Sequence, residues 1–264
     1  MNTPLTDSIN ALTAYANETT GASDATLSDA VGRLCEGYDG GSDAFVIQSI
    51  ASGLNGLFEV TNTMPYIVPA SVTIPKKIKI VAPYCRSITE MFYCQSTAYA
   101  HYPIEEIELD LLYTQITCID AFRRAWKLKK VIFTNGLIPR NASYMFESSA
   151  IETVVGEIDY TNVNNSRMFR GATNIKDITL KPNTWKSTEG IVFSSNVLTD
   201  ASLVTIANAL STASAGQTLT HASTAKARCS TLIGNNDNGT FVADENGTIS
   251  LADFITTVKG WALA

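Results

Sequence analysis

Histidine is scarce in this sequence, and long apolar runs are absent. Only His101 and His221 occur among the 264 residues, and neither has a cysteine or carboxylate nearby at the spacing of a metal site. No stretch approaches the 18 uncharged apolar residues that a membrane-spanning helix requires. We therefore expect two surface histidines, no metal site, no cofactor and no insertion into a membrane.

The sequence also lacks the motifs of common hydrolases. It has no G-x-S-x-G motif, and a serine triad would have to recruit one of the two histidines. Residues 237–249 are rich in Asp, Asn and Gly, but aligning Gly247 with the invariant glycine of a calcium loop puts Val242 at the first ligand position. We therefore predict turns here, and a non-enzymatic protein without catalytic or metal-binding residues.

Cysteine occurs in an odd number and never in a C-x-x-C pair, which predicts free, mostly buried thiols. The first 16 residues lack the basic region, the unbroken apolar region and the cleavage site of a secretion signal. We therefore expect synthesis in a cytosol without a secretion signal. The five cysteines are Cys35, Cys85, Cys94, Cys118 and Cys229.

Basic residues are outnumbered by acidic ones. The chain has 19 Lys and Arg against 25 Asp and Glu, which gives a formal net charge of -6. This balance is unfavourable for binding a nucleic acid backbone, so we expect no nucleic acid partner. Hydrophobic residues make up 45% of the chain, enough to build a buried core.

Two short sets of apolar residues near the N-terminus recur at helical spacing. They precede the glycine-rich segment 37–43, which is the best candidate linker. A segment this small does not easily fold alone, so we expect residues 1–41 to form a helical assembly segment and the protein to be a homo-oligomer. The two sets are Leu5, Ile9 and Leu12, and Leu27, Val31 and Leu34.

The middle of the chain contains repeats. Residues 122–133 align with residues 169–180 at every apolar position, and the shared unit is F-x-x-A-x-x-[LI]-x-x-[VI]-x-[FL]. The copy between them, which begins at Phe146, is one residue shorter. A central Ile or Val, the pivot of each copy, recurs after 29, 24, 23 and 24 residues, a leucine-rich-repeat period. The pivots are Ile78, Ile107, Val131, Val154 and Ile178.

Charged residues next to the pivots alternate in sign from copy to copy. Two positions before each pivot stand Lys76, Glu105, Lys129, Glu152 and Lys176. On neighbouring parallel strands about 4.8 Å apart, such side chains attract one another. Arg123, Glu147 and Arg170 alternate in the same way directly after the repeat's Phe. The apolar row two positions after the pivot contains Ile80, Leu109, Phe133 and Leu180, with Gly156 as a gap.

The repeats predict an α/β fold, a short solenoid of about five rungs over residues 42–182. The period stops after Leu180, and residues 183–264 read as an α/β cap. Helices are expected at 198–210, 224–233 and 250–258, with short strands at 217–221 and 261–264. We expect these two strands to extend the solenoid sheet and to cover its open end.

Residues 70–182 resemble the BspA-like leucine-rich repeat family, whose unit reads A-F-x-x-C-x-x-L-x-x-I-x-I-P. Ala121-Phe122 and Lys181-Pro182 match the two ends of the unit, while Ala125 and Ala172 replace the usual Cys. The flanks LTDSINALTAYAN, TLSDAV and LADFITTVKGWALA resemble tail-associated leucine-rich-repeat proteins of phages and prophages of gut Gram-positive bacteria. The resemblance implies a virion component with a binding role rather than an activity.

The candidate binding residues are aromatic. Tyr99, His101 and Tyr102 lie in the insertion 96–103, and solenoids place such loops on one face, often the binding face. The alternative is a loop that packs its tyrosines against the first rung. Trp126 and Trp185 stand between the apolar rows, so a core role and a binding role are both open.

A basic run, Arg123, Arg124, Lys127, Lys129 and Lys130, suits an anionic wall polymer, although charge pairing with the neighbouring acidic rungs is the favoured interpretation. We expect a phage tail or baseplate protein that recognises the host surface, with other tail proteins and a host glycan or protein as partners. The alternatives are a purely structural virion component and a bacterial surface adhesin.

Overall fold

The computed structural model describes most of the chain from residue 76 onward and two short strands before it. The predicted helical assembly segment, residues 1–41, lies outside the described residues, and so does the insertion 96–103. The described ranges are 45–48, 58–59, 76–81, 85–94, 104–111, 115–161, 167–186, 190–214 and 216–264.

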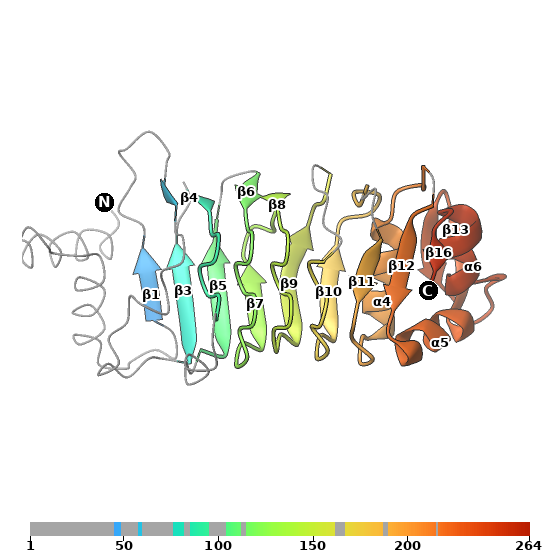
Figure 1. Ribbon diagram of the computed structural model, residues 1–264. Coiled ribbons are helices and arrows are strands. Elements are labelled where there is room, and N and C mark those ends of the chain that lie inside the picture. Colours follow the sequence, from blue (N-terminus) through green and yellow to red (C-terminus); the bar gives the residue numbers. More distant parts are fainter. Residues whose placement is uncertain are drawn as a thin grey trace, which may run out of the picture.

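Six parallel strands form the main sheet of a solenoid (Figure 1). The strands follow one another in the sheet in the order of the chain, and the five predicted pivots pair directly across them. The predicted register is therefore confirmed. The sheet also contains one further strand, which precedes the strand of the first pivot, Ile78. The strands are β1 (Phe45–Gln48), β3 (Lys77–Val81), β5 (Glu106–Asp110), β7 (Lys130–Phe133), β9 (Thr153–Ile158) and β10 (Asp177–Leu180).

A second parallel sheet runs along the solenoid beside the first. Its strands are two or three residues long, and each lies between two strands of the main sheet in the sequence. Turns, not helices, complete the rungs wherever residues 76–194 are described. The second sheet contains β2 (Phe58–Glu59), β4 (Cys85–Ser87), β6 (Ile116–Thr117) and β8 (Pro139–Asn141).

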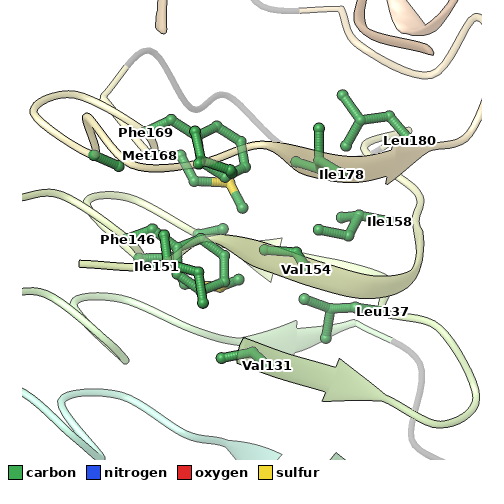
Figure 2. Packing of buried hydrophobic residues seen from close by; sticks show 14 of the residues in the cluster. Val131, Leu137, Phe146, Ile151, Val154, Ile158, Met168, Phe169, Ile178 and Leu180 are labelled. Atoms are coloured by element: carbon green, nitrogen blue, oxygen red, sulfur yellow. The ribbon is translucent and has the colours of Figure 1, made fainter. Parts of the chain in front are cut away.

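Stacked aromatic rings fill one side of the solenoid core. The rings of Phe92, Phe122, Phe146, Phe169 and Phe193 follow one another at centroid distances of 5.7, 5.2, 5.6 and 4.8 Å. In Figure 2, Phe146 and Phe169 lie on neighbouring rungs, and the aliphatic rows lie beside them. The stack continues to Phe193, which lies beyond Leu180 in the sequence. The expectation that the repeat stops after Leu180 is therefore wrong for the row of stacked phenylalanines.

Gly156 is a bulge position and not a gap in the apolar row. The register between β9 and β10 shifts, so that Leu180 pairs with Ile158, which is fully buried. Gly156 has φ +99°, and a Cβ on it would lie 2.3 Å from the carbonyl oxygen of Phe133. The strand therefore needs a glycine here, and Ile158 fills the row two residues later.

A helix, not a strand, closes the end of the main sheet. This helix, α4 (Asp200–Ala209), begins after the N-cap Thr199 and lies beside β10. Ser202 Oγ accepts from the backbone N–H of Ile178 at 3.1 Å, and Thr205 Oγ1 accepts from the N–H of Leu180 at 3.1 Å. These hydroxyls accept hydrogen bonds from backbone N–H groups at the edge of β10 that would otherwise bond to a further strand.

The prediction that two C-terminal strands extend the solenoid sheet is therefore wrong. They instead form a separate parallel sheet with a strand that the sequence did not predict. The order in this sheet is β11 (Ile191–Phe193), β12 (Thr218–His221) and β16 (Ala262–Leu263).

The other helices predicted between residues 198 and 258 lie close to their predicted positions. Residues 237–249, which were predicted to form turns, contain strands as well. Asn238 and Gly239 both have positive φ and connect two antiparallel strands as a tight hairpin. The helices are α5 (Ser223–Thr231), α6 (Leu251–Asp253) and the π-helix η2 (Phe254–Val258). The antiparallel strands are β13 (Ile233–Asp237), β14 (Thr240–Ala243) and β15 (Ile249–Ser250).

No helix in the described part of the chain is both long and apolar enough to cross a bilayer.

Candidate binding surface on the turn face

Consecutive β-turns lead the rung of Phe122 from the second sheet back to the main sheet. In the rung of Phe122, the N–H of Ala125 donates to the carbonyl of Phe122 at 3.2 Å, and the N–H of Leu128 donates to the carbonyl of Ala125 at 3.3 Å. These three turn ends are buried. The residues between them therefore form the turn corners, which are less buried than the ends.

Arg123, the first corner residue, is fully engaged within the protein. Its guanidinium lies 3.2 Å from Asp120 Oδ1 and 2.8 Å from Glu147 Oε2. It also lies over the rings of Tyr93 and Tyr144, at 5.5 and 5.1 Å from their centroids. Arg123 is therefore a structural residue that joins three rungs.

Glu147 is buried between two arginines of neighbouring rungs, as the alternating charges predict. Arg123 lies on one side, and Arg170 Nε donates to Glu147 Oε1 at 2.6 Å on the other. Burial raises the pKa of the nearby Asp120 above its usual value, although Arg123 opposes this shift. The row of Arg123, Glu147 and Arg170 is confirmed as an ion-pair ladder.

Ion pairs also link neighbouring strands of the main sheet. Glu105 Oε1 lies 2.9 Å from Lys76 Nζ, and Glu105 Oε2 lies 3.0 Å from Lys129 Nζ. These two ammonium groups lower the pKa of Glu105 to about 2. One row further, Lys130 Nζ lies 3.6 Å from Glu106 Oε2. The predicted alternation of charge is therefore present as ion pairs between neighbouring strands.

Two cations of the basic run remain without such a partner. Arg123, Lys129 and Lys130 are ion-paired, but the side chains of Arg124 and Lys127 form no ion pair or hydrogen bond with any residue that the structure describes. Arg124 is partly exposed and Lys127 is exposed. The favoured interpretation of the run as internal charge pairing therefore holds for three of its five members.

Trp126 lies between these two cations in the sequence. It is the first central residue of the turn 125–128, Lys127 is the second, and the indole is partly exposed. We call Arg124, Trp126 and Lys127 the basic corner. It combines an aromatic ring with two cations that form no ion pair with any carboxylate in the described part of the chain.

Trp185, the other candidate tryptophan, belongs to the core. It is fully buried, and its ring stacks on Tyr160 at a centroid distance of 4.5 Å and meets Phe193 edge to face. The structure therefore assigns Trp185 to packing and leaves it no surface for a partner. Trp261 is likewise buried.

Tyr99, His101 and Tyr102 lie outside the described residues, so their binding role stays a prediction. Sequence reasoning also missed a contact between Arg167 and Tyr144. Arg167 lies 5.9 Å from the centroid of the Tyr144 ring, and its Nη1 donates to the Tyr144 hydroxyl at 3.4 Å.

His221 is buried, so the expectation of a surface histidine is wrong here. Its ring lies 5.7 Å from that of Phe193 and takes the next place in the phenylalanine stack. Burial lowers the pKa of His221 to about 4, and neither ring nitrogen has a hydrogen-bond partner among the described residues. The same part of the chain holds no group of three His, Cys, Asp or Glu side chains that could bind a metal.

Comparison with protein-family models, with curated proteins and with solved structures finds no match for this chain. The candidate surface is therefore argued from its own residues. The basic corner can hold an anionic group by charge and a ring or carbon chain by contact with the indole.

Proposed function

We propose that this chain is a non-enzymatic tail or baseplate protein of a phage, in which a leucine-rich-repeat solenoid contributes to host-surface recognition. The observation that carries the binding role is the basic corner. It leaves an indole and two cations available on a scaffold whose neighbouring charges are paired. The resemblance of the flanks to tail-associated proteins supports the virion assignment.

The leucine-rich type of the rungs belongs to this proposal. The repeat F-x-x-A-x-x-L places its named residues at the buried turn ends Phe122, Ala125 and Leu128. We expect the repeat unit of the BspA-like family to show the same alternation of buried turn ends and outward turn corners. A scaffold of this kind holds loops and corners in fixed positions, which suits recognition more than a reaction.

The proposed mechanism is multivalent contact. A corner of three side chains offers only weak binding to a surface, because exposed charges are screened by solvent and salt. Several chains joined through their N-terminal segments would bind the same cell together and gain avidity without further contacts. Residues 1–41 are the proposed assembly segment.

Binding of the fluorescently labelled full chain to a panel of gut Gram-positive bacteria, measured by flow cytometry, tests this function. We expect the chain to bind some strains and Trp126→Ala to bind them at least several-fold less. Val197→Ala is the matched control, since Val197 is 48% exposed and lies in another part of the solenoid. A chain that binds no strain in the panel contradicts the proposal, and a monomer that binds tightly contradicts its multivalent mechanism.

One observation favours a structural virion component as the second candidate. Val155 is 40% exposed on β9 and pairs directly with Ile132 of β7, which is half-buried. This apolar pair on the outer face of the main sheet suits packing against another tail protein. If Val155→Asp abolishes incorporation into particles while Trp126→Ala leaves attachment intact, the structural role is the correct one.

A further inference from the structure

We propose that the basic corner binds a polymer with repeated phosphate groups on the host surface. This inference rests on the proposed function and names the ligand class of the same site. It excludes a neutral glycan as the main ligand.

The first step is the balance of charge at the corner. Each acidic residue near it already has a cation: Asp120 pairs with Arg123, and Glu147 pairs with Arg123 and Arg170. Glu105 is shared by Lys76 and Lys129. An anion that approaches Arg124 and Lys127 therefore does not have to displace an internal carboxylate.

The second step is the position of the indole. Trp126 and Lys127 are the two central residues of one β-turn, and Arg124 is the residue before its first position, Ala125. The next rung is one residue shorter and places Ala150 beside the turn, where its N–H donates to the Ala125 carbonyl at 3.2 Å. The Trp126 indole is partly exposed, and an indole face stabilises carbon chains or sugar rings that connect charged groups.

The third step is the backbone of Arg124. Its φ is +55°, a left-handed conformation that a side chain other than Gly adopts at a cost. The corresponding residues of the next two rungs are Ser148 and Gly171. The left-handed conformation is therefore shared by this position in three rungs, and the rung of Phe122 differs in having an arginine there that forms no ion pair in the described part of the chain.

The fourth step is the choice of phosphate. Lysine binds phosphate as a point charge, and arginine binds it through its fork of donors. One Arg and one Lys beside the same turn therefore suit a tetrahedral anion. The chain has a net charge of -6, so an anion is attracted by the nearby cations and not by the molecule as a whole. A polymer with many anionic groups therefore gains most, because it can make the same weak contact repeatedly.

Tryptophan fluorescence provides a direct test with the full chain. Trp185 and Trp261 are buried, so the emission that acrylamide quenches comes from Trp126. We expect poly(glycerol phosphate) to protect this emission from acrylamide, with an affinity that falls as the salt concentration rises. A neutral dextran of similar length serves as the polymer control and is expected to give no protection.

Charge-removing variants locate the site. The double variant Arg124→Asn/Lys127→Gln keeps a residue that tolerates left-handed backbone at position 124 and should weaken poly(glycerol phosphate) binding by about tenfold or more. Lys226→Gln removes one charge from an exposed position on α5 and should leave the affinity unchanged. Circular dichroism verifies that each variant is folded.

The outcomes separate this inference from the proposed function. Equal protection by polygalacturonate, a carboxylate polymer, would overturn the choice of a phosphate polymer, and so would unchanged affinity in the folded double variant. If the double variant still binds host cells as the unmodified chain does, the ligand assignment fails while the recognition function stands. If the unmodified chain binds the polymer but no cells, the recognition function itself is contradicted.

Discussion

Left-handed backbone recurs at two positions of the turns, two residues before and two residues after the stacked phenylalanine. Arg124, Ser148 and Gly171 occupy the second position with φ of +55°, +56° and +74°. Glycine reaches this conformation without a steric penalty, whereas Ser and Arg do not. The backbone at this position is therefore strained in the rungs of Arg124 and Ser148 and unstrained in the rung of Gly171.

Ser148→Gly is therefore expected to raise the free energy of unfolding by about 1 kcal/mol, because it removes the left-handed penalty. The reverse change, Gly171→Ser, should lower it, since a Cβ at Gly171 would lie 2.9 Å from Ser148 Oγ. Urea unfolding followed by circular dichroism measures both values. A destabilised Ser148→Gly would show that the Ser148 side chain contributes more than its strain removes.

His221 gives the fold a dependence on pH. Its pKa is about 4 in the folded chain and 6.5 in a free side chain, so the unfolded chain binds more protons between these values. The stability is full above about pH 6.5 and is lost as the pH falls toward 4. From pH 7 to pH 5 the loss from this residue is about 2 kcal/mol.

The variant His221→Phe should remove this loss and continue the phenylalanine stack with a ring of the same kind as in the other rungs. Urea unfolding of both proteins at pH 7 and pH 5 measures the difference. We expect a shallower pH dependence in the variant. The prediction is wrong if the two proteins lose equal stability on acidification.

At the scale of elements, α4 replaces a strand at the end of the main sheet. Its hydroxyls accept from the N–H groups of Ile178 and Leu180, and Thr205 Oγ1 also donates to the Leu180 carbonyl at 3.2 Å. A helix whose side chains pair a strand edge stops further strand addition. The solenoid is thereby ended by side-chain chemistry rather than by a lack of apolar residues.

The double variant Ser202→Ala/Thr205→Val keeps the helix and removes these bonds. We expect it to lower the free energy of unfolding by about 2 to 4 kcal/mol, because it leaves buried edge groups unpaired. Hydrogen exchange should accelerate most at the amides of Ile178 and Leu180. Thr256→Val in η2, which also loses a hydroxyl bond, serves as control; similar exchange at β10 in both variants would contradict the capping role.

The solenoid was predictable where the sequence repeats side-chain chemistry from rung to rung. The pivots fixed one register, because a shift of one residue would turn the buried apolar row to the outer face of the sheet. The bulge at Gly156 was not predictable, since the two extra residues that bring Ile158 opposite Leu180 leave the spacing of 24 residues between the pivots Val154 and Ile178 unchanged. The hairpin at Asn238 and Gly239 did carry a recognisable turn signal.

The candidate site was only half predictable. Trp126 and Trp185 both stand between the apolar rows, and the sequence does not show that Tyr160 and Phe193 cover the second ring. The pairing of Arg123, Lys129 and Lys130 followed from the alternating rungs. That Arg124 and Lys127 stay unpaired depends on the turn geometry, which places them at corners away from the ladders.

At the scale of the whole molecule, the charges of the solenoid are mostly used within it. The ladders run along the rungs and pair cations with anions from β3 to β10. Long-range attraction to an anionic cell surface is therefore small for a chain with a net charge of -6. Recognition by such a molecule requires either a deep pocket or several weak corners acting together.

Avidity makes a prediction about assembly. Residues 1–41 are the proposed assembly segment, so the full chain should be an oligomer, and a chain that begins at Ser42 should be a monomer with the same circular dichroism melting curve over the solenoid. Light scattering coupled to size exclusion measures both masses. The shortened chain should also bind host cells many-fold more weakly, because each corner then acts alone. If both chains are monomers, avidity has no basis, and the solenoid must bind through a single strong site or serve as a part held by other tail proteins.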